Sequence, residues 1–168
     1  MAKMGLHSDP HEMDGYKPIA EGRYHAMITD VNDQREPRPG KDANSAPKCS
    51  DMLTLEILAG ECPGMEGKTL RCFLSLKKEK GEWVETEIHT RWAWAAGILD
   101  QDKEIDFYPS MLTGREVIVE VVNDGKYVNV GGYGYNVWRV GDDCVRGVPT
   151  AAAPQPVTAA GNAEEVFI

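Results

Sequence analysis

Two segments of this chain combine aromatic and cationic side chains in a way that suits one kind of chemistry. The segment Lys68–Lys77, KTLRCFLSLK, sets Arg71 and Phe73 between apolar residues, and the segment Tyr127–Val140 carries three tyrosines among glycines. Unpaired bases stack on aromatic rings at about 1–3 kcal/mol each, while cations attract the phosphates. These residue types predict a surface for single-stranded nucleic acid.

The candidate contacts come from both segments and from the polar loop Asn32–Lys48. They are Arg71, Phe73, Lys68, Lys126, Tyr127, Tyr133, Tyr135, Arg35 and Arg38. In a regular strand the three tyrosines share one face, and the neighbouring Gly131, Gly132 and Gly134 indicate a bulge or a close approach by a ligand. The alternative is that some of these rings simply fill the core.

Short alternating segments bounded by turn residues predict the strands that must position these side chains. Expected strands are Gly22–Val31, Asp51–Ala59, Lys68–Lys77, 115–124 and Tyr127–Val140, with an Asp-Gly hairpin turn before the last. Apolar residues at helical spacing predict a helix over Glu85–Leu99, capped by Thr86.

Five strands with one helix between the third and fourth is the element order of the OB-fold, an all-β Greek-key barrel. The helix then plugs one end, and the loop after strand one and the hairpin after strand four flank the binding face. An antiparallel α+β sandwich of the same elements is the competing fold. We expect an N-terminal extension over residues 1–20, the barrel over 21–141, and a disordered Pro/Ala-rich tail over 142–168.

The charge balance opposes nucleic-acid binding, because the formal net charge is −9. The tail accounts for −3 of this, and −6 falls on residues 1–141. No apolar run approaches the ~20 residues of a membrane span, and residues 1–16 lack an apolar signal core, which favours a cytoplasmic protein.

No nucleophile elbow, phosphate loop or metal-binding helix motif occurs, and His25 and His89 have no evident carboxylate–nucleophile partners. The four cysteines form no CxxC pair, and a zinc site from them with His7 and His11 matches no standard finger spacing. The sequence therefore predicts a binding module with no cofactor, metal or catalytic residue.

The chain ends in acidic residues followed by exposed hydrophobics: Glu164, Glu165, Val166, Phe167 and Ile168. This ending resembles the C-terminal tip of bacterial and phage single-stranded DNA-binding proteins, which docks onto replication, recombination and repair proteins. Residues 16–140, with Glu21-Gly22-Arg23-Tyr24, Leu53-Thr54-Leu55, Gly67-Lys68, Arg91-Trp92 and Gly114-Arg115, look like small phage-encoded proteins of that class. The resemblance implies an OB-fold that coats single strands and recruits partners through the tip.

Two other functions fit the acidic composition. One is a protein-binding adaptor or structural (virion) barrel, and the other is a DNA mimic that blocks a DNA-binding enzyme. Clustered cations beside exposed aromatics on one face favour DNA, whereas an apolar or acidic face favours an adaptor.

Overall fold

Alternating apolar residues build three long antiparallel strands at the start of the chain. The computed structural model describes residues 18–40, 42 and 44–151 of the sequence. In it β1 spans Gly22–Asn32, β2 spans Ser50–Gly60 and β3 spans Thr69–Ser75. Every second side chain points inward, as in β2, where Leu53, Leu55 and Ile57 are fully buried. The predicted strands in this half are confirmed.

The remaining elements are shorter. They are β4 (Lys77–Glu79), β5 (Glu82–Val84), α2 (Glu87–Ala95), β6 (Glu116–Asn123), β7 (Val128–Val130) and β8 (Val137–Trp138), with 3₁₀ turns η1 (Pro109–Leu112), η2 (Gly132–Gly134) and η3 (Asp143–Val145). The hairpin of β4 and β5 was not predicted, because strands of three residues are too short to show a period of alternation.

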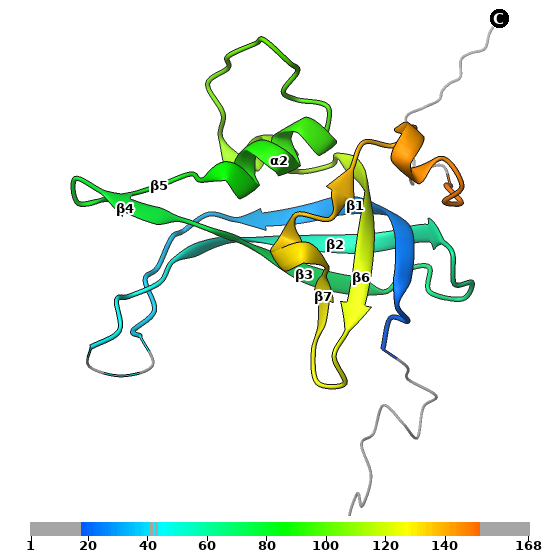
Figure 1. Ribbon diagram of the computed structural model, residues 1–168, viewed down its shortest axis with the longest axis horizontal. Coiled ribbons are helices and arrows are strands. Elements are labelled where there is room, and N and C mark those ends of the chain that lie inside the picture. Colours follow the sequence, from blue (N-terminus) through cyan, green and yellow to red (C-terminus); the bar gives the residue numbers. More distant parts are fainter. Residues whose placement is uncertain (1–17, 41, 43, 152–168) are drawn as a thin grey trace, which may run out of the picture.

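The long strands form a curved sheet in the order β3-β2-β1-β6-β7, with β8 also pairing to β6. Every pairing is antiparallel, and two register shifts between β1 and β2 bend the sheet. The outer strands β3 and β7 then come into contact and nearly close a barrel (Figure 1). The all-β, OB-fold-like architecture expected from the element order is therefore confirmed.

Helix α2 covers one end of the barrel, and its Trp92 is fully buried in the core. The helix begins after Thr86, as predicted, and the Thr86 hydroxyl donates to the Ser75 carbonyl at 2.7 Å. No helix in the described part of the chain is both long and apolar enough to cross a membrane.

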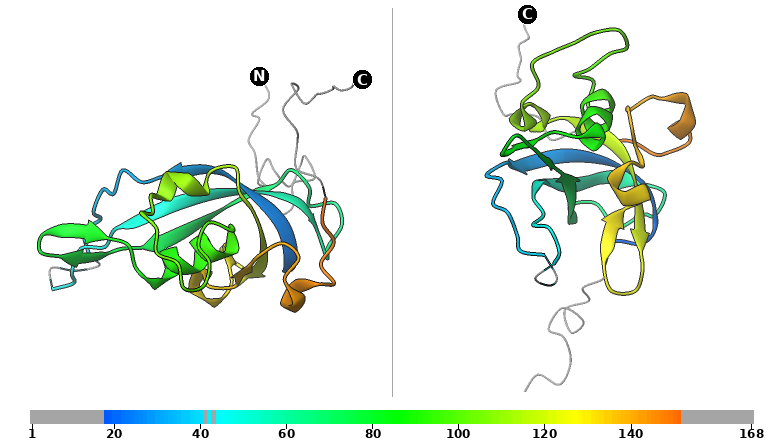
Figure 2. Two further views of the ribbon diagram at one scale, coloured as in Figure 1. Left: turned by 90° about the horizontal axis from the view of Figure 1, so that it is seen from above. Right: turned by 60° about the vertical axis from the view of Figure 1, so that its left-hand side comes forward.

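Two loops project from the side of the barrel opposite α2 (Figures 1 and 2). One is the segment between β1 and β2, residues 33–49, which we call the arm. The other is the turn between β6 and β7. Strand β3 runs between them in the right-hand view of Figure 2, so both loops flank its outer face as expected.

The predicted fifth strand over Tyr127–Val140 is wrong as a single continuous element. It is broken into β7, η2 and β8, because Gly132, Tyr133 and Gly134 adopt positive φ values of 65°, 56° and 91°. Such values are incompatible with an extended strand. The predicted common face of the three tyrosines is therefore lost.

The segment from Asp142 to Ala151 packs on the outside of the barrel. Val145 and Val148 are buried against Ile118 of β6, and the Ala151 amide donates to Nδ1 of His25 at 3.0 Å. The packed chain thus extends past the boundary expected at residue 141. The N-terminal residues 1–17 and the tail from residue 152, including the tip Glu164–Ile168, lie outside the described residues.

Candidate nucleic-acid interface

A groove follows the outer face of β3, where β3 meets β7 and η2. Its larger part is a hollow of about 470 Å³ that Arg71, Phe73 and Ser75 of β3 line on one side. Asn129 to Gly134 line the other side, and Val122 of β6 also contributes. Strand alternation explains the arrangement, because it turns Leu70, Cys72 and Leu74 inward and Arg71, Phe73 and Ser75 outward.

The groove continues toward the arm. A second hollow of about 180 Å³ lies between Phe73, Met52 and the first residues of the arm, so Phe73 borders both hollows. The guanidinium of Arg38 stands 5.8 Å from the centre of that ring. Phe73 is 46% exposed, which leaves ring surface for a ligand. We call the two hollows together the β3 groove.

Tyr133 stands at the far side of the β3 groove with 97% of its surface exposed. Its φ of 56° is uncommon for a residue other than glycine, so the surrounding structure must hold it. The carbonyl of Gly134 accepts a 2.8 Å hydrogen bond from Nε1 of buried Trp92, and the side chain of Asn136 packs against Gly132. The core therefore holds the backbone of the turn that carries the exposed Tyr133 ring.

The local charge of the β3 groove differs in sign from that of the whole chain. The charged residues that line it are Arg35, Arg38 and Arg71 against Glu36. Arg35 is already paired with Asp51 and Glu85, so Arg38 and Arg71 are the cations of the groove that are open to a ligand. The hollow of about 660 Å³ on the helix side is instead lined by Glu85, Glu104 and Asp106 against Lys103. The charged residues that line this hollow are thus mostly acidic, whereas those of the β3 groove are mostly cationic.

Not all predicted contact residues meet in the β3 groove. Tyr135 lines a different hollow, beside Trp94 and Leu99 on the helix side. Lys68 precedes the first residue of β3 and does not line the groove.

The hairpin between β6 and β7 carries Lys126 and Tyr127 beyond the end of the β3 groove. The Lys126 ammonium is 5.2 Å from the centre of the Tyr127 ring. Alternation along β7 places Tyr127 on the same outward side as Asn129, which lines the groove. These two residues could lengthen the surface without lining its hollows.

Arg35 belongs to a buried polar network that the sequence did not reveal. Its guanidinium contacts both carboxylate oxygens of Asp51, at 3.1 and 3.2 Å, and also bonds to Glu85 and to the Trp83 carbonyl. Asp51 is fully buried and is bonded to Nε2 of His89 at 2.8 Å. Because the Thr86 amide donates to Nδ1 of His89, the ring proton lies on Nε2.

Both histidines thus have the carboxylate partners that the sequence did not show. The second pair is Nε2 of His25 with Glu116, at 2.7 Å, on the opposite side of the sheet from the arm network.

Cys72 lies in the floor of the β3 groove, and burial raises the pKa of its thiol to about 12, so the thiol stays protonated. Among the described residues, no group of three or more His, Cys, Asp or Glu side chains is arranged to hold a metal ion.

We expect Asp51→Asn to lower stability in a pH-dependent way. Burial opposes ionisation of Asp51, but hydrogen bonds from His89 and Arg35 outweigh it and hold the pKa of the carboxyl below its usual range. The stabilisation is therefore complete above the unfolded pKa of about 4 and is lost as the pH falls through the folded pKa. Urea unfolding should show a loss of about 1–3 kcal/mol at pH 7. The gap to wild type should shrink below about pH 4; a gap independent of pH would contradict this assignment.

The fold and the groove together define a small, nearly closed β-barrel with an aromatic and cationic groove on one face. No family model matches the chain, and no curated protein matches it either. Its function must therefore be inferred from the barrel's own geometry.

Proposed function

We propose that this protein binds single-stranded DNA without strong sequence preference and coats it during replication or recombination. The observation that carries the proposal is the β3 groove, where exposed Phe73 and Tyr133 lie with Arg38 and Arg71 on a protein of net charge −9. The position of this groove between the arm and the β6–β7 hairpin fits the face that OB-folds use for oligonucleotides. The proposal places the protein in the cytoplasm, that of the host if a phage encodes it.

The chemistry of the groove explains the expected tolerance of sequence. Every base offers a π-face to Phe73 or Tyr133, and Arg38 and Arg71 can meet phosphates whatever the sequence. A duplex keeps its bases stacked inside and offers those rings nothing to stack on. Single strands should therefore bind in preference to duplex.

The decisive experiment is fluorescence anisotropy with a labelled oligo-dT, at low and moderate salt, beside a duplex of equal length. Binding to the single strand that weakens with salt supports the proposal, because each released counterion contributes to the salt dependence. The slope should be shallow, since few cations line the groove. Absence of binding even at low salt would reject it.

The tip Glu164–Ile168 lies outside the described residues, and we propose that it recruits replication or recombination proteins. Deleting it should leave the affinity for oligo-dT equal or higher, because two negative charges are removed. Capture on immobilised single-stranded DNA should show partner proteins with the full chain and none with the deleted chain. Phe167→Ala, which keeps the charge, should lose the partners as well; recruitment by the deleted chain would remove the tip from the proposal.

An adaptor that binds proteins is the second candidate, and the acidic hollow of about 660 Å³ beside α2 favours it. An adaptor of this kind would use the helix side of the barrel and leave Phe73 and Tyr133 without a role. The anisotropy measurement separates the two, since only the first proposal requires binding of oligo-dT.

A further inference from the structure

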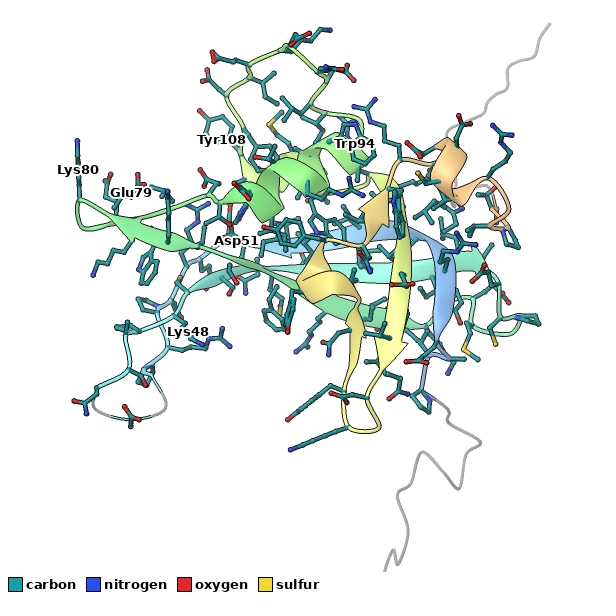
Figure 3. All side chains as sticks on the ribbon, viewed as in Figure 1. Lys48, Asp51, Glu79, Lys80, Trp94 and Tyr108 are labelled. Atoms are coloured by element: carbon teal, nitrogen blue, oxygen red, sulfur yellow. The ribbon has the colours of Figure 1, made fainter. Side chains whose placement is uncertain are left out.

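A buried polar network lies where the arm leaves the barrel. Arg35 belongs to the arm, Asp51 to β2, His89 to α2, and Glu85 to the segment before α2. Figure 3 shows Asp51 below α2 and Lys48 beside the arm, and Asp51 is fully buried. The network therefore ties the arm to three parts of the barrel at once.

The contacts of Arg35 go beyond what a surface loop needs. Its guanidinium makes a two-point contact with Asp51, whose carboxylate is fully buried, and it also reaches Glu85 and the Trp83 carbonyl. Its backbone adopts φ 58°, an unfavourable conformation for a residue with a Cβ. Such strain persists only where neighbouring contacts fix the residue, and it gathers at binding sites.

The part of the arm that Arg35 anchors also contains Arg38, which lines the β3 groove. The Arg38 backbone pairs in both directions with that of Lys48, at 2.7 and 2.9 Å, which closes the base of the arm. From this position the Arg38 guanidinium lies over Phe73. Arg35 and Arg38 also line the same hollow.

We propose that Asp51, acting through Arg35 and supported by Glu85, positions the arm so that Arg38 and Phe73 form one binding surface for nucleic acid. Asp51 is buried and touches no ligand, so it is a positioning residue. This inference rests on the proposed binding of single-stranded DNA. Its physical basis is preorganisation, since an arm already held in place loses less conformational entropy when the ligand binds.

The experiment compares two glutamates of nearly equal exposure, each of which pairs with a basic side chain. One belongs to the arm network and the other does not. Glu85 is 38% exposed and pairs with Arg35, whereas Glu116 is 37% exposed and pairs with His25. We expect Glu85→Gln and Asp51→Asn to weaken binding of labelled oligo-dT about tenfold. Glu116→Gln should bind like wild type. Amide hydrogen exchange over residues 33–40 should rise in the first two variants only.

A double-mutant cycle with Arg38→Ala tests whether the effect passes through the arm. In the Arg38→Ala background, Glu85→Gln should cause little further loss of affinity. Additive losses, or unchanged exchange over residues 33–40, would overturn the inference while leaving the proposed function in place. Wild-type binding by both Glu85→Gln and Asp51→Asn would do the same. If the unaltered protein fails to bind oligo-dT, the proposed function falls and this inference falls with it.

Discussion

The double variant Phe73→Ala with Tyr133→Ala should weaken binding of single-stranded DNA by about 2–6 kcal/mol if each ring stacks on one base. The two residues border the same hollow from opposite sides, Phe73 from β3 and Tyr133 from η2. Tyr133 is 97% exposed, so its removal costs the fold little and the loss can be read as binding. Titration of labelled oligo-dT by anisotropy measures the change.

The matched control removes two other exposed tyrosines from the helix side of the barrel. Tyr135 is 41% exposed and Tyr108 is 64% exposed, and Figure 3 shows Tyr108 on the helix side of the barrel, beside α2. Tyr135→Ala with Tyr108→Ala should bind like wild type. Equal losses in the two double variants would mean that binding follows general aromatic content, and an unchanged affinity in the first would exclude Phe73 and Tyr133 as stacking platforms.

The strands and helix of the barrel could be predicted because each follows from the pattern of neighbouring residues within one segment. Leu53, Leu55 and Ile57 alternate with polar residues, and that period fixes both the strand and its buried face. The same alternation places Phe73 outward, so the central residue of the β3 groove followed from sequence. The helix was equally visible, since Ile88 and Trp92 recur at helical spacing and both are buried.

The arrangement of the tyrosines depended on information that periodicity does not carry. A regular strand was expected to hold Tyr133 and Tyr135 on one face, but the turn at Gly132–Gly134 sends them to different hollows. The glycines gave a signal of irregularity without its geometry. One contact made at the turn is the hydrogen bond from Trp92 to the Gly134 carbonyl, between residues 42 positions apart in sequence.

Ionic contacts between distant residues could not be predicted either, because periodicity does not show which segments meet. Arg35, Asp51 and His89 come from an arm, a strand and a helix, and nothing in their spacing indicates that they meet. Arg35 was expected on a solvated loop, where it would contact phosphate. The structure shows instead that Asp51 holds Arg35, which leaves Arg38 of the two predicted arginines as the candidate phosphate contact in the arm.

Trp92→Ala should lower the free energy of unfolding by about 3–5 kcal/mol, the usual cost of removing a fully buried large side chain. Trp92 is the largest fully buried side chain of the core. Its loss leaves a cavity under α2 and also removes the donor to the Gly134 carbonyl. Urea unfolding followed by far-UV circular dichroism measures the effect, because tryptophan fluorescence would itself change.

Trp94 provides the comparison within the same helix. Trp94 is partly exposed, and the guanidinium carbons of Arg91 and Arg139 are 4.5 and 5.3 Å from the centre of its ring. Trp94→Ala should cost about 1–2 kcal/mol, mostly from these cation–π contacts. An equal cost at the two positions would contradict the assignment of Trp92 to the core and of Trp94 to the surface.

Trp92→Phe separates the role of Trp92 in packing from its role in holding Tyr133. Phenylalanine keeps most of the apolar contact but cannot donate to the Gly134 carbonyl. Leaving this buried carbonyl unpaired should lower the free energy of unfolding by about 1–3 kcal/mol. If that hydrogen bond holds the turn, Trp92→Phe should weaken binding of oligo-dT in the wild-type background. It should cause no further loss in Tyr133→Ala, because the ring it positions is already gone. An equal loss in both backgrounds would show that Trp92 affects binding by another route than the position of Tyr133.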